Sequence, residues 1–167
     1  VESGPAPEGF NARFDAVSKT YRYLILPCSR LHAIMDRYAW VMEDALDVEA
    51  MSRAAASLTG RHDFSSFRSA GSVDGNAVRN VDRLDVTKGM IDHLGARYIA
   101  ITARADGFLY KMVRNMVGAI VEVGLGKEES PDYIGRLLAH KDRTLAPAPA
   151  PASGLYLIEV LYPKDMI

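Results

Sequence analysis

The amino-acid sequence predicts an α+β fold, with one antiparallel sheet and helices packed on one of its faces. Residues 18–26 alternate as a strand does, and residues 81–87 and 97–104 read as paired strands joined by a loop containing Gly89 and Gly95. Apolar residues later in the chain recur at helical spacing. Strands in long antiparallel pairings with helices between them favour helices on one face, which leaves the other face available for binding.

Composition excludes several classes of protein. The chain has 167 residues, 49% hydrophobic and 25% charged, which is typical of a globular domain with a sizeable core. A lone cysteine, Cys28, excludes an internal disulfide and predicts a reducing, cytoplasmic compartment, while four histidines without ligand spacing predict no metal site. No apolar run is long enough to span a membrane. The first residues contain neither a signal peptide nor an initiator methionine, so Val1 reads as a cut.

The formal net charge of -1 argues against a uniformly basic nucleic-acid surface, so a role of that kind needs a local patch. Acidic residues gather at 43–49 and 128–132. Basic residues fall near predicted strand and helix ends: Arg13, Lys19, Arg22, Arg68, Arg79, Arg104, Lys111 and Arg114. Such segregation is also common on ordinary surfaces.

The first strand, Ser18–Leu26, places Tyr21 and Tyr23 side by side on one face. Asp47 is the expected N-cap of a helix that Gly60 ends. The apolar positions of that helix are Val48, Met51, Ala55 and Leu58.

The segment Phe108–Gly118 predicts an amphipathic helix that ends around residues 124–126, with Asp106 as a cap. Its apolar stripe contains Leu109, Met112, Val113, Met116, Val117 and Ile120. Arg114 lies at the edge of that stripe, and a guanidinium placed there favours a carboxylate or phosphate partner. The alternative is an arginine whose stem packs while its head stays in water.

The last third of the chain begins with Ser130 as a cap and Pro131 at the first position of a short helix through Ile134, Leu137 and Leu138. Residues 146–153, rich in alanine and proline, predict an extended connection, and residues 155–162 a closing strand. A glycine-containing loop over residues 70–77 is expected in solvent, with contact to RNA as the alternative.

Aromatic and basic side chains together suggest a nucleic-acid surface, because unstacked bases are held by aromatic rings and cations. Tyr21, Tyr23, Phe64 and Phe67 could line the open sheet face. The alternative, which we favour for the last three, is that they are core residues.

Seven short motifs add a resemblance that periodicity cannot supply. They are FNARF at 10–14, KTYRY at 19–23, DFSSFR at 63–68, RNV at 79–81, FLYKMVRNMVG at 108–118, KDRTL at 141–145 and GLYL at 154–157. Their order and approximate spacing resemble the tRNA pseudouridine synthases of the TruA family. The resemblance runs from Phe10 to Pro163 and implies that residues 1–167 are the carboxy-terminal domain of the catalytic body, with an amino-terminal domain outside this chain.

The resemblance implies a pseudouridine synthase-like fold, a homodimer and a tRNA substrate. Members of the family isomerise uridine to pseudouridine in the anticodon arm, without a cofactor, and the target nucleotide must leave its stack. Tyr21 matches the active-site tyrosine that stacks on the base and helps to move the C5 proton. Arg114 matches the partner of the catalytic aspartate, and Leu155 an apolar residue of the pocket. Arg13, Arg68 and Arg79 are the expected further substrate contacts. The alternatives are a half-buried strand tyrosine, a snorkelling arginine and a core leucine.

One departure from the family pattern matters most. The nucleophilic aspartate of the family lies in a Gly-Arg-Thr-Asp motif upstream of the part seen here, and Asp15, Asp63, Asp106 and Asp142 lack those flanking residues. We therefore expect half an active site and no isomerase activity from this chain alone. Two other functions stay open: a non-catalytic RNA-binding module, and an unrelated small-molecule enzyme or assembly domain. The sequence offers the latter no phosphate loop or nucleophile arrangement, and Cys28 reads as inert.

Overall fold

The computed structural model describes residues 6–27, 32–71, 75–128, 130 and 132–163. Cys28, Pro131 and the centre of the predicted loop 70–77 lie outside these residues. The strands are β1 (Ser18–Leu26), β2 (Trp40–Val41), β3 (Gly60–Asp63), β4 (Val78–Ile91), β5 (Ala96–Ala105) and β6 (Leu155–Leu161). The α-helices are α1 (His32–Met35), α2 (Val48–Ala56), α3 (Met112–Gly124) and α4 (Tyr133–His140), with single 3-10 turns at Ser65–Phe67, Asp92–Leu94, Arg143–Leu145 and Ala152–Gly154.

The strands form one sheet in the order β2-β1-β5-β4-β3, and β6 pairs with the edge of β1 that β5 does not use. All pairings are antiparallel except the two-residue contact between β1 and β2. The predicted α+β fold is therefore confirmed, with β2 as a short parallel addition. Within the described residues no strand pairs with the outer edge of β6, where Leu157 is 54% and Ile158 50% exposed.

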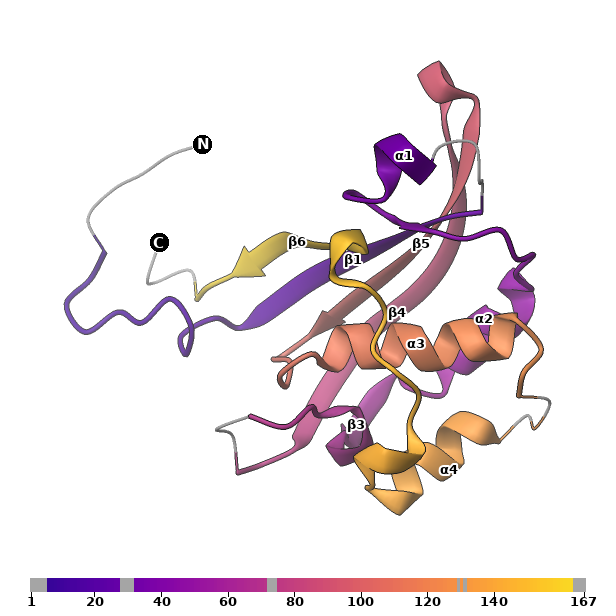
Figure 1. Ribbon diagram of the computed structural model, residues 1–167. Helices are drawn as coiled ribbons and strands as arrows, with labels where there is room; N and C mark the ends of the chain where they lie inside the picture. The colour runs from indigo at the N-terminus through magenta and orange to yellow at the C-terminus, as the bar shows by residue number, and fades with distance from the viewer. Residues whose placement is uncertain (1–5, 28–31, 72–74, 129, 131, 164–167) are drawn as a thin grey trace.

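Helices α2 and α3 lie against one face of the sheet, and α4 lies beside them (Figure 1). The main core between these layers contains Tyr23, Phe64 and Phe67, which are fully buried. The core interpretation of these three rings is confirmed. Tyr21 packs partly buried against the same core, so these aromatic rings do not line the face opposite the helices. Strand parity correctly places Tyr21 and Tyr23 together, and packing turns that face toward the helices.

Helix α3 begins four residues later than the periodicity predicts. Lys111 precedes it with a left-handed backbone, φ 59°, so residues 108–111 form a turn whose apolar side chains continue the helical stripe. The prediction that Asp106 caps the helix is wrong. Its carboxylate accepts the backbone N–H of Asn80 at 3.0 Å instead, joining the end of β5 to the start of β4.

Two smaller expectations also change. The N-cap of α4 is Asp132 rather than Ser130, whose carbonyl accepts the N–H of Tyr133 at 3.1 Å. Gly89 lies inside β4 rather than in the loop, where a Cβ would collide with the ring of Tyr98. The N-cap role of Asp47 is confirmed, because its side chain accepts two backbone N–H groups at the start of α2.

The predicted extended connection forms what we call the strap, residues 146–151, which passes across α3 before the turn at Ala152–Gly154 leads into β6 (Figure 1). Gly118 of α3 lies directly beneath the carbonyl of Ala148, where a side chain would collide with the strap. A glycine at this helix position therefore permits the close crossing.

Candidate active site

Tyr21 occupies the middle of β1, paired with Ala103 of β5 and Leu157 of β6. The register of β1 against β6 shifts between Thr20 and Tyr21, where β6 carries one extra residue, Ile158. The Tyr21 ring meets Phe108 edge to face, with centroids 5.3 Å apart and an interplanar angle of 87°. This contact restricts the orientation of the phenol.

Arg114 is half-buried on α3 and is held by the strap. Its Nε donates to the carbonyl of Ala150 at 2.6 Å, and its own carbonyl accepts the Ala150 N–H at 3.0 Å. No acidic side chain of the described residues forms an ion pair with Arg114. A guanidinium fixed through Nε presents its two terminal nitrogens as a fork, which is the geometry that a carboxylate or phosphate accepts.

Tyr23 holds the same strap from the sheet side. Its fully buried hydroxyl donates to the carbonyl of Pro151 at 2.7 Å. Burial raises the pKa of Tyr23 well above its ordinary value, although the charge of Arg114 acts in the opposite direction. Tyr23 is therefore a neutral donor across the ordinary pH range. Gly154 leaves room for this ring, since a Cβ there would lie 2.7 Å from its Cζ.

Leu155 begins β6 directly after the turn that follows the strap, opposite Tyr23 in the pairing with β1. It is partly buried against the main core. The strap thus links the guanidinium of Arg114 to Leu155, and Tyr21 precedes Tyr23 by two residues on the same face of β1.

The three expected arginine contacts do not lie together. Arg13 and Arg79 line one hollow of about 300 Å³, beside the residues around Phe108. Arg68 is half-buried directly after the turn Ser65–Phe67 and does not line that hollow.

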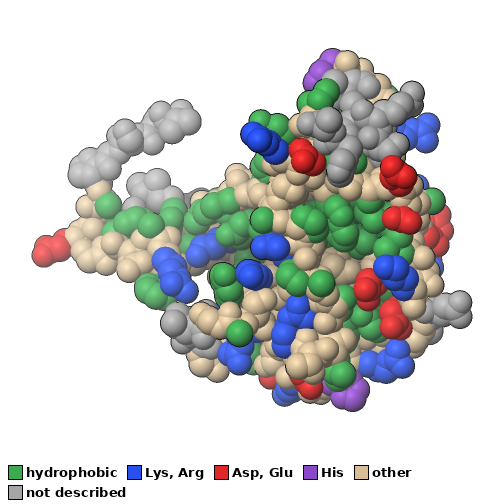
Figure 2. All heavy atoms as spheres, viewed as in Figure 1, with side chains coloured by type: hydrophobic (Ala, Val, Ile, Leu, Met, Phe, Trp, Pro, Cys, Tyr) green, Lys and Arg blue, Asp and Glu red, His purple; other side chains and the backbone are tan. Residues whose placement is uncertain are grey.

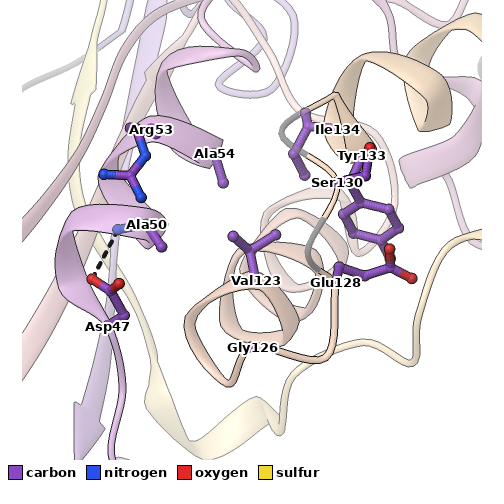
Figure 3. A pocket seen from close by; sticks show the side chains of 10 residues that line it. All are labelled: Asp47, Ala50, Arg53, Ala54, Val123, Gly126, Glu128, Ser130, Tyr133 and Ile134. Carbon is purple, nitrogen blue, oxygen red and sulfur yellow. Dashed lines mark hydrogen bonds between the residues drawn. The ribbon is translucent and has the colours of Figure 1, made fainter.

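A second hollow of about 400 Å³ lies between the start of α2, the end of α3 and α4 (Figure 3). Its lining mixes apolar groups such as Val123 with Arg53, Glu128 and Tyr133, and it includes neither Tyr21 nor Arg114. This hollow therefore lies apart from the site that the sequence motifs indicate.

Asn115 is a fully buried polar residue that the sequence analysis did not single out. Its amide nitrogen donates to the carbonyl of Phe67 at 2.6 Å, and its oxygen accepts from Arg143 at 3.1 Å. These bonds join α3 to two 3-10 turns. The signal in the sequence is a polar side chain next to Arg114 within an apolar helix, which burial can accommodate only with partners.

Comparison with known proteins supplies the deciding observation. A family model described as tRNA pseudouridine synthase matches residues 54–163. The chain is 41% identical over 158 residues to tRNA pseudouridine synthase A of Enterobacter sp., which covers 95% of this chain and 56% of the relative. The chain belongs to the tRNA pseudouridine synthase family.

Two further members of that family are similarly related. The Hydrogenovibrio crunogenus tRNA pseudouridine synthase A is 41% identical over 162 residues, 96% of this chain and 59% of the relative. That of Acidiphilium cryptum is 40% identical over 169 residues, 99% of this chain and 62% of the relative. The chain thus spans less than two thirds of the length of these tRNA pseudouridine synthases.

Family membership confirms the resemblance carried by the seven motifs, and the structure gives two of them a structural role. Asp63 accepts the N–H and hydroxyl of Ser65 and pairs with Lys141 at 3.1 Å, joining the DFSSFR and KDRTL motifs. The Ser65 hydroxyl and then Lys141 hold the pKa of the Asp63 carboxyl below its usual range.

Among the described helices, none combines the length and apolar character needed to cross a bilayer.

Proposed function

We propose that this chain is the part of a tRNA pseudouridine synthase that supplies Tyr21, Arg114 and Leu155 to the active site, and that it is inactive alone. The observation that carries the proposal is Arg114, which is half-buried and held through Nε without an acidic partner among the described residues. A cation in that position gains most from a carboxylate brought to its remaining nitrogens. That carboxylate would belong to polypeptide outside these 167 residues.

The proposed reaction is an isomerisation of a uridine turned out of its stack. The bond between N1 of uracil and C1′ of the ribose breaks, and a bond between C5 and C1′ forms. The C5 proton leaves and N1 ends protonated, so atoms and electrons balance without a cofactor. Tyr21 would stack on the base and assist the transfer of the C5 proton, while Leu155 would form an apolar wall of the pocket.

The proposed substrate is the anticodon stem-loop of tRNA, with Arg13, Arg68 and Arg79 as further contacts. Arg13 and Arg79 line the same hollow as Phe108, the residue that the Tyr21 ring meets edge to face. We also propose that the synthase acts as a homodimer in the cytoplasm.

The decisive experiment compares the turnover of two proteins. One is the isolated chain, and the other is a version extended upstream to the length of the relatives. Tritium release from tRNA carrying [5-³H]uridine measures turnover. We expect none from the isolated chain and turnover from the extended protein, lost by a factor of about 100 or more in the Arg114→Gln and Tyr21→Phe variants.

Arg136→Gln serves as the control, because that exposed arginine pairs with Glu128 at 3.8 Å and belongs to α4. Turnover by the isolated chain would contradict the half-site. An extended protein that binds tRNA with a steep salt dependence yet forms no pseudouridine would instead indicate an RNA-binding module.

A further inference from the structure

We propose that the hollow beside Phe108 binds a phosphodiester of the RNA strand, and that Phe14 stacks on the base next to the target nucleotide. The inference rests on the proposed function and assigns a binding site to the nucleotide next to the target uridine. The hollow has a volume of about 300 Å³. It is lined by Arg13, Phe14, Lys19, Val78, Arg79, Asp106, Gly107 and Phe108.

Charge favours an anion in this hollow. Three of the lining side chains are cations and one, Asp106, is an acid, so cations outnumber acids in the lining. On the face seen in Figure 2, Lys and Arg side chains predominate on the left and centre, and most Asp and Glu side chains lie on the right. The local excess of positive charge thus exists although the whole chain carries a formal charge of -1.

Lys19 and Arg79 are oriented by backbone carbonyls. Lys19 Nζ donates to the carbonyl of Arg13 at 3.1 Å, and a terminal nitrogen of Arg79 donates to the carbonyls of Asn76 and Val78 at 2.9 and 2.8 Å. A carbonyl orients the Lys19 ammonium without cancelling its charge. Part of the side-chain entropy that RNA binding would remove is therefore already lost in the free protein.

Phe14 presents a large aromatic ring to solvent beside these cations. It is 72% exposed, and the Arg13 guanidinium carbon lies 5.3 Å from its ring centroid. The ring belongs to a structured turn, since Asn11 Oδ1 accepts the backbone N–H groups of Arg13 and Phe14 at 3.0 and 3.2 Å. An ordered, exposed aromatic ring next to cations is the arrangement on which proteins stack unpaired bases.

Two connections join the hollow to the proposed site. Phe108 lines the hollow and also meets the Tyr21 ring at 5.3 Å. Lys19 precedes Tyr21 by two residues in β1, so their side chains leave the same face of the sheet. A base stacked on Tyr21 would therefore place an adjacent phosphate toward Lys19 and the next base toward Phe14.

Binding of a fluorescein-labelled anticodon stem-loop RNA to this chain, measured by anisotropy from 50 to 300 mM salt, tests the inference without needing catalysis. Arg13→Gln and Lys19→Gln should each weaken binding about three-fold or more and lower the slope of log Kd against log salt by about one. Phe14→Ala should weaken binding about five-fold or more and leave the slope unchanged. An RNA that lacks the stacked base should erase the effect of Phe14→Ala.

Arg136→Gln is the matched control for charge, and circular dichroism checks that each variant is folded. If the three variants bind like the parent chain, or if Arg136→Gln loses as much affinity as Arg13→Gln, the inference fails while the turnover experiment still decides the proposed function. Failure of the parent chain to bind the RNA would also overturn it. Competition by poly-glutamate with no effect of Phe14→Ala would indicate an acidic protein partner instead.

Discussion

Tyr23 and Arg114 are two residues that fix a segment with no regular structure of its own. One donates to Pro151 and the other to Ala150, so consecutive carbonyls of the strap are held from the sheet and from α3. Strand parity predicts that Tyr21 and Tyr23 share a face, and helical periodicity predicts Arg114 at the edge of an apolar stripe. Neither pattern predicts their acceptors, because the path of the strap depends on packing between residues far apart in the sequence.

Removal of the Tyr23 hydroxyl tests this arrangement. Tyr23→Phe leaves the Pro151 carbonyl without its donor and should lower the free energy of unfolding by about 1 kcal/mol at pH 7. Urea unfolding measures the change, and Tyr110→Phe, at a 51% exposed tyrosine, is the control.

The same variant has an expected pH signature. The folded-state pKa of Tyr23 is raised above the ordinary 10.0 by burial, so the contribution of the neutral hydroxyl is fully present below that value and is lost as pH rises through the folded pKa. Tyr23→Phe should therefore lose less stability than the parent chain in alkaline solution. Parallel stability curves for the two proteins above pH 10 would contradict this assignment.

At the scale of elements, α3 and the strap depend on one close crossing. The sequence predicts the body of α3 and an end around residues 124–126, and the helix ends at Gly124. The sequence does not predict its start, because residues 108–111 carry apolar side chains that continue the helical pattern. It also predicts that residues 146–151 are extended. The use of Gly118 as the crossing point could not be predicted, since a glycine in a helix gives no sign of what lies above it.

Substitution of Gly118 by alanine tests the crossing. Glycine to alanine within a helix ordinarily stabilises a protein by about 0.5–1 kcal/mol, but a Cβ at Gly118 would collide with the backbone carbonyl of Ala148. We expect Gly118→Ala to lower the melting temperature. Gly135→Ala in α4 is the matched control, because its Cβ would meet only the Asp132 side chain, which can rotate away. If both variants melt at the temperature of the parent chain or above it, the strap can move away from α3 at little energetic cost, and the prediction is wrong.

At the scale of the whole molecule, the sequence predicts the α+β class and the long strands because their hydrophobic patterns extend over many residues. It misses β2 and β3, of two and four residues, because such short segments carry no measurable period. The motifs in the sequence indicate Tyr21, Arg114 and Leu155 as residues of the candidate site. The sequence does not predict the hollow beside Phe108, since Arg13 and Arg79 are far apart in the chain and only the fold brings them together.

The outer edge of β6 has a consequence for the chain in solution. Leu157 and Ile158 are 54% and 50% exposed on a strand whose second edge is unpaired in the described part of the molecule. Edges of this kind recruit strands from other copies. Sedimentation velocity of this purified chain should therefore reveal reversible self-association that grows with protein concentration, and Leu157→Lys should suppress it. A chain that remains monomeric at millimolar concentration would show that this edge is protected in another way.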